Sequence, residues 1–170
     1  FDLVIAGAQM VNVFTLEITP VDVGIVGRYI AYAGPAGQES LHAAERIVAD
    51  GRWLTPGFID CHVHIESSML TPVHFARAVL PHGTTTVYAD PHELANVLGL
   101  DGVRYVLETS AHLPLKVFVQ APSCVPSVPG LEHAGASFGG DEIAQMLRWP
   151  RVLGVAEVMD YVGVIAQAPR

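Results

Sequence analysis

The sequence has few cysteines, few charged side chains and no long uninterrupted apolar run, and each shortage excludes a class of protein. Cys61 and Cys124 are too few for a disulfide framework, so a reducing, cytoplasmic location is expected. A net charge of −8 argues against nucleic acid or an anionic membrane as partner. Apolar stretches are broken by Gly, Pro, Asp or His short of a membrane span, and the first residues lack a signal-peptide pattern.

Hydrophobic residues, in contrast, make up 51% of the 170 positions. This content suits strands that are buried on both faces of a parallel sheet. The length allows one medium domain, or a small domain with part of a larger one. Since the chain opens on Phe1 inside a strand pattern and ends at Arg170 just after another, we expect it to be a piece of a longer polypeptide.

Residues 1–55 carry short strand patterns and turn signals. Separate strands are predicted at 2–6 and 10–13. The pairs Gly27-Arg28 and Asp50-Gly51 lie between further strand patterns, and each predicts a two-residue hairpin. We therefore predict a small antiparallel β domain here, sandwich-like and part of a composite sandwich.

Residues 56–170 alternate between strand and helix patterns. Helices are predicted to begin after the N-cap candidates Thr71 and Asp141, and another carries Val103, Val106 and Leu107 on one face. Such alternation predicts a parallel sheet of right-handed βαβ units. The expected fold is α/β: the first four units, hence the N-terminal half, of a (β/α)8 TIM barrel that follows a β domain. The predicted strands are 58–64, 85–89, 115–120 and 152–156.

The first chemical motif is His62-Val63-His64, at the end of the first barrel strand. Residues i and i+2 of a strand point to one face, so both imidazoles can reach one divalent cation. The alternative is a chance pair satisfied by ordinary hydrogen bonds. The position favours a metal site, because unpaired imidazoles at the end of a buried strand are costly.

Polar groups also follow two later strands. Asp90, His92 and Glu93 come directly after the second strand, where they either face a barrel mouth or cap the next helix. Glu157 follows the fourth strand and is either a solvated loop carboxylate or an inward ligand able to span two metal ions.

Several segments resemble known families. Residues 56–64, Pro-Gly-Phe-Ile-Asp-Cys-His-Val-His, resemble the opening strand of the amidohydrolase superfamily. More specific segments resemble the bacterial adenine deaminases within that superfamily. These are Glu66-Ser67-Ser68-Met69, Gly83-Thr84-Thr85-Thr86, residues 90–97 from Asp-Pro-His-Glu onward, Pro122-Ser123-Cys124-Val125-Pro126 and residues 154–159.

The resemblance implies hydrolytic deamination of adenine to hypoxanthine and ammonia at a binuclear divalent metal centre (Mn, Fe or Zn, with Mn favoured). It implies a small purine substrate and a homo-oligomeric full-length protein. His62 and His64 would bind metal, and Glu157 would bridge the metals and serve catalysis. Further catalytic candidates are Asp90, His92 and Glu93, and substrate-binding candidates are Glu66, Ser67 and Ser123.

Two other readings stay open. One is a different amidohydrolase, such as a dihydroorotase-like cyclic amidase or an amino-sugar deacetylase, which would share the His-x-His strand. The other is a non-catalytic metal-binding fragment. The family's remaining ligands come from later strands, so the chain by itself is expected to be inactive.

Overall fold

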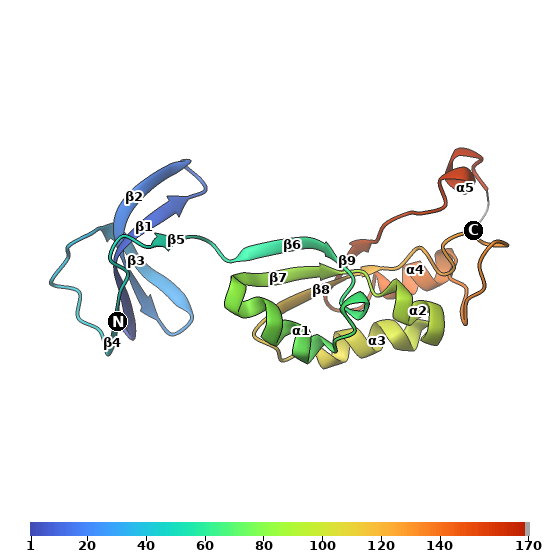
Figure 1. Ribbon diagram of the computed structural model, residues 1–170, viewed down its shortest axis with the longest axis horizontal. Coiled ribbons are helices and arrows are strands. Elements are labelled where there is room, and N and C mark those ends of the chain that lie inside the picture. The colour runs from blue at the N-terminus through green and yellow to red at the C-terminus, as the bar shows by residue number, and fades with distance from the viewer. Residues whose placement is uncertain (169–170) are drawn as a thin grey trace. The chain divides into compact units, whose positions relative to one another are not determined.

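The computed structural model describes residues 1–168, which fall into two compact units. Figure 1 labels the helices and strands of both units. The first unit is Phe1–Pro56, and the second begins at Gly57. Each unit has a sheet and a core of its own. Within residues 1–168, no helix is long and apolar enough to cross a membrane.

The first unit is a single five-stranded sheet. Its strand order is β3-β2-β1-β4, with β5 also paired to β1. The predicted turn at Gly27-Arg28 is confirmed, because Val26 pairs with Tyr29 across it. The strands are β1 (Leu3–Asn12), β2 (Glu17–Val26), β3 (Tyr29–Pro35), β4 (Glu45–Val48) and β5 (Trp53–Leu54).

Two predictions for the first unit are wrong. The strands predicted at 2–6 and 10–13 are one continuous strand, β1 (Leu3–Asn12), whose register shifts between Ile5 and Ala8, around a glycine at φ +68°. The bulge absorbs the glycine without ending the strand. Nor does Asp50-Gly51 form a hairpin, because β4 and β5 each pair in parallel with β1. Residues 1–56 hold one sheet, so a sandwich-like domain is not confirmed.

The second unit is a parallel sheet with helices between its strands, as predicted. The order β6-β7-β8-β9 follows the chain, and Figure 1 shows α1 and α3 along one face of this sheet. The strands are β6 (Phe58–Val63), β7 (Thr84–Ala89), β8 (Lys116–Ala121) and β9 (Val152–Val155). The α-helices are α1 (Pro72–Val79), α2 (His92–Leu98), α3 (Leu100–Thr109), α4 (Gly140–Met146) and α5 (Tyr161–Ile165). Short 3₁₀ turns are η1 (Glu66–Ser68) and η2 (Leu80–His82).

Alternation along the central strands decides which side chains can form a site. Val117, Val119 and Ala121 of β8 are buried in the cluster that also holds Val103 and other α3 side chains. Since strand residues alternate between faces, Gln120 lies on the opposite face of β8. Polar side chains at the carboxyl ends of these strands therefore lie on or beside the sheet face away from α3.

Helix boundaries match the predictions in part. The first helix begins at Pro72 with Thr71 in the N-cap position, as predicted. Asp141, however, is not an N-cap: that position is Gly139, whose backbone N–H donates to the Glu142 carboxylate at 2.8 Å. The helical segment after β7 is divided into α2 and α3 at Gly99, where φ is +62°.

Candidate metal centre

The two histidines at the end of β6 point toward one another. His62 is the penultimate residue of β6, and His64 follows its last residue. Their Nε2 atoms are 3.1 Å apart. Two nitrogen ligands at about 2.0–2.1 Å from one cation lie about 3 to 3.4 Å from each other. The predicted pairing of these imidazoles is therefore present, at the separation that a shared cation requires.

Hydrogen bonds at the far side of each ring determine where the lone pairs point. His64 Nδ1 is 2.8 Å from the Asp90 carbonyl oxygen, which can only accept, so Nδ1 carries the hydrogen. His62 Nδ1 lies 3.2 Å from Oε1 of Gln120 and donates to it. In the neutral form of each ring, Nε2 then has a lone pair directed at the other ring, an arrangement that a cation stabilises.

Gln120 was missed by the sequence reasoning. The available signal was alternation, because the residue on either side of Gln120 in β8 is buried against helices and Gln120 must face the other way. What the sequence does not show is that β8 lies near enough to β6 for the amide to meet His62. That proximity follows from the sheet order, with only β7 between them.

Glu157 supplies a carboxylate to the same cluster. It follows the end of β9, and its side chain is about one-third exposed, at 36%. Glu157 Oε2 lies 3.7 Å from His62 Nε2, and Glu157 Oε1 lies 3.6 Å from both His64 Nε2 and His92 Nδ1. The carboxylate thus faces three imidazoles that come from two other strand ends.

Asp90 is fully buried beside these groups, with 0% of its side chain exposed. Its Oδ2 lies 3.3 Å from His92 Nδ1, and this hydrogen bond is the main cause of the raised pKa of His92. Its Oδ1 has no hydrogen-bond partner among the described residues. A buried carboxylate oxygen without a partner is costly, which is consistent with a cation as its missing partner.

The donor set fits divalent metal ions. Two overlapping groups each have ligand atoms within 4.8 Å of one another and share His64: His62, His64, Asp90 and Glu157; and His64, His92 and Glu93. Imidazole nitrogens and carboxylate oxygens are the ligands that Zn, Fe and Mn take in proteins. The residues present can thus hold one or two such ions.

The predicted substrate-binding residues Glu66 and Ser67 lie in η1 and contact α2. The Ser67 hydroxyl donates to Glu93, and Glu66 Oε1 accepts from the Leu94 backbone at 3.4 Å. Burial, helped by the neighbouring Glu93 carboxylate, raises the pKa of Glu66 to about 7. Burial acts the same way on Glu93, but hydrogen bonds from Ser67 and Glu66 outweigh it and lower its pKa.

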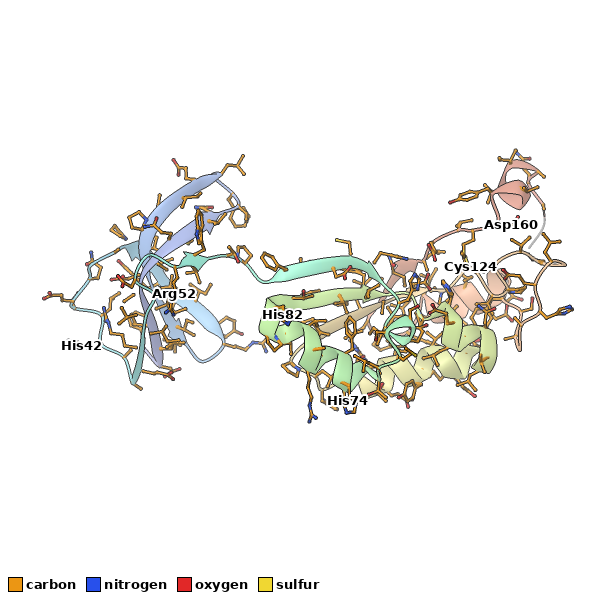
Figure 2. All side chains as sticks on the ribbon, in the orientation of Figure 1. His42, Arg52, His74, His82, Cys124 and Asp160 are labelled. Atoms are coloured by element: carbon orange, nitrogen blue, oxygen red, sulfur yellow. The ribbon has the colours of Figure 1, made fainter. Side chains whose placement is uncertain are left out.

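Ser123 and Cys124, which belong to a motif noted in the sequence, lie after β8 and contact the backbone carbonyl oxygen of Glu157. The Ser123 hydroxyl donates to the Glu157 carbonyl oxygen at 2.5 Å. Figure 2 labels Cys124, and it also shows that His74 and His82 lie well away from it, on the helical side and at the opposite end of the second unit. Those two histidines take no part in the cluster.

A match to a protein family covers most of the second unit. The model of the amidohydrolase family matches residues 53–162. This chain belongs to the amidohydrolase family. Its cluster at the strand ends is therefore part of an amidohydrolase-type α/β fold with a parallel sheet.

Curated relatives narrow the comparison. The chain is 52% identical over 168 residues to adenine deaminase of Moorella thermoacetica, which covers 99% of the chain. It is 55% identical over 170 residues to adenine deaminase of Klebsiella pneumoniae and 48% identical over 167 residues to adenine deaminase 3 of Rhizobium meliloti, which cover 100% and 97% of the chain. The chain spans 28% of the length of each of these relatives.

A solved structure shows the same fold at low identity. A variant of atrazine chlorohydrolase TrzN from Arthrobacter aurescens, complexed with zinc and atraton, superposes with a TM-score of 0.63. Sequence identity is 17%, and the match covers 84% of this chain and 41% of that one. At this identity the likeness bears on the amidohydrolase fold alone.

Proposed function

We propose that the whole protein is a metal-dependent aminohydrolase that converts adenine, a cyclic amidine, to hypoxanthine and ammonia. The observation that carries the proposal is the convergence of His62, His64 and Glu157 with a fully buried Asp90 at the carboxyl ends of parallel strands. Relatives named adenine deaminase, 48–55% identical across nearly all of this chain, support adenine as the substrate.

The chain's own residues would hold and orient the metal. His62 and His64 would bind it through Nε2, because each Nδ1–H is already engaged by an oxygen. Glu157 would contribute both carboxylate oxygens, since these lie at similar distances from different imidazoles. When bound, a divalent pair supplies a water of lowered pKa for attack on the amine-bearing ring carbon.

The residues after β7 support and complete this cluster. The Asp90 carbonyl fixes the orientation of His64, and the Asp90 carboxylate holds His92. His92 and Glu93 face Glu157 and His64, respectively, from the start of α2. We assign Asp90, His92 and Glu93 to proton handling and site polarity, and Glu66 and Ser67 to the rim that meets the purine.

The cofactor proposal is a binuclear divalent centre, with manganese as the preferred ion and iron or zinc as the alternatives. A protein of the same fold, the atrazine chlorohydrolase described above, is solved with zinc. The proposal extends to a small purine ligand, a homo-oligomeric full-length protein and a cytoplasmic location. The acidic net charge of −8 agrees with a soluble small-molecule enzyme that has no nucleic-acid partner.

The test is an assay of the whole protein, loaded in turn with Mn²⁺, Fe²⁺ and Zn²⁺, against adenine, dihydroorotate and an N-acetyl amino sugar. Release of ammonia from adenine alone supports the proposal. Turnover of dihydroorotate or of the N-acetyl sugar without adenine turnover points to a different amidohydrolase. Residues 1–170 alone, the matched control, are expected to bind metal without turning over adenine.

A further inference from the structure

The segment that carries Glu157 lies beyond the last hydrogen bond between its strand and the neighbouring strand. β9 ends at Val155, and the last inter-strand hydrogen bond runs from the Ala156 amide to the Ala121 carbonyl at 2.9 Å. Residues 156–160 belong to no helix or strand. The sheet alone therefore leaves the Glu157 backbone free to turn about the strand end.

Two side chains from the neighbouring strand end meet at the Glu157 carbonyl oxygen. The Ser123 hydroxyl donates to it at 2.5 Å, and the Cys124 thiol donates to it at 3.2 Å. A carbonyl oxygen has two lone pairs, so both donors can be accepted at once. Cys124 is 0% exposed, and burial raises the pKa of its thiol, so it is placed as a donor and not as an accessible nucleophile.

The backbone of Cys124 is in turn bonded to α2, the helix that begins with His92 and Glu93. Asn96 of α2 donates from Nδ2 to the Cys124 carbonyl at 3.1 Å and to the His92 carbonyl at 2.8 Å. The network therefore joins the ends of three strands: α2 follows β7, Ser123 and Cys124 follow β8, and Glu157 follows β9.

We infer that Ser123 and Cys124 are positioning residues that hold Glu157 by its backbone carbonyl, keeping its carboxylate within reach of the histidines. In this role they act through Glu157, whereas the sequence led us to expect a substrate contact for Ser123. The inference rests on the proposed function, in which Glu157 is a metal ligand. It matters because ligand distances in a metal site are tolerated only within about 0.2 Å, so a small rotation of the strand end loosens the metal.

The experiment compares Ser123→Ala, Cys124→Ala, Cys124→Ser and the double variant Ser123→Ala/Cys124→Ala in the whole protein. Metal dissociation constants for Mn²⁺ and Zn²⁺ are measured by chelator competition, together with KM and the thermal unfolding of the metal-free protein. Ser127→Ala is the matched control, since Ser127 lies in the same loop and is 9% exposed. Its hydroxyl makes no hydrogen bond in the described structure.

Loss of both donors is expected to weaken metal binding about 10-fold or more, as is typical when groups that orient a ligand are removed. Cys124→Ser keeps a hydrogen-bond donor and should therefore retain most of the metal affinity that Cys124→Ala loses. KM should change less than about twofold in these variants. An unchanged metal affinity in the double variant overturns the inference. A raised KM with unchanged metal affinity in Ser123→Ala also overturns it, and makes Ser123 a substrate contact.

The variant Glu157→Gln distinguishes failure of the positioning role of Ser123 and Cys124 from failure of the proposed function. If Glu157→Gln weakens metal binding and the double variant does not, only the positioning role of Ser123 and Cys124 is wrong. If Glu157→Gln leaves metal affinity unchanged, the metal role of Glu157 is wrong. Should Cys124→Ala fail to fold, Ser123→Ala and Cys124→Ser give the decision by the same criteria.

Discussion

The contact between α2 and α3 leads to a prediction in which two physical effects have opposite signs. Gly102 lies in the first turn of α3 and is buried against α2. A Cβ atom at this position would lie 2.6 Å from the Leu94 carbonyl oxygen and 2.7 Å from its carbon. Those atoms belong to the backbone, so no side-chain rotation can relieve the contact, and the two helices must move apart.

The magnitudes decide the sign of Gly102→Ala. Alanine in a helix is favoured over glycine by up to about 1 kcal/mol. Overpacking costs about 1–3 kcal/mol, because ordinary contacts of about 3.5 Å require the helices to separate by nearly 1 Å. We therefore expect the variant to lose about 1 kcal/mol of unfolding free energy. Since α2 begins with His92 and Glu93, its displacement should also weaken metal binding.

The assay is urea unfolding of the whole protein, monitored by circular dichroism, with Gly140→Ala as the matched control. Gly140 begins α4, and nothing lies within 4 Å of a Cβ atom built there. Gly140→Ala is expected to gain about 0.5 kcal/mol. A Gly102→Ala protein as stable as Gly140→Ala, with unchanged metal affinity, would refute the reasoning.

Three further predictions concern polar side chains that form hydrogen bonds with other parts of the chain. Burial alone would raise the pKa of Asp22, but backbone N–H donors lower it below 3.8, so Asp22→Asn should lose about 2 kcal/mol at pH 7. The stabilising effect of the carboxylate is complete above pH 3.8 and is lost as the pH falls through the lowered pKa of folded Asp22. Urea unfolding at pH 7 and pH 3 should therefore show a smaller stability difference between wild type and Asp22→Asn at pH 3. Gln120→Leu removes the acceptor of His62 and should raise the metal dissociation constant about 10-fold in chelator competition; no change contradicts its orienting role. Arg151→Ala removes donors to Ser110 and to two backbone carbonyls and should lower the unfolding free energy by about 2 kcal/mol or more, whereas a neutral result contradicts it.

The sequence predicted the parallel unit well because its signals are local. Thr71-Pro72 marks a helix start, and the apolar strands alternate with helical patterns whose order alone implies parallel pairing. In the first unit, local signals were misleading. The turn at Asp50-Gly51 joins strands that both pair with β1, and such pairing depends on long-range contacts that a two-residue motif does not contain.

The site was predictable as far as strand ends could be recognised. His62 and His64 share a face because they are two residues apart, and Glu157 meets them because parallel strands end at one edge. The contacts of Gln120 and Ser123 were not predictable, since each depends on the particular neighbour that the sheet order brings within hydrogen-bond distance. Spacing in the sequence gives a residue's face but not its partner.

The central claim, that His62, His64 and Glu157 hold a divalent cation, is tested most directly by metal content. The whole protein is incubated with Mn²⁺, Fe²⁺ or Zn²⁺, freed of unbound ion and analysed by elemental mass spectrometry beside His64→Ala and Glu157→Gln. The account predicts stoichiometric metal in the wild type and strongly reduced metal in both variants, with unfolding of the metal-free proteins little changed. A folded wild-type protein that retains none of these ions would contradict it.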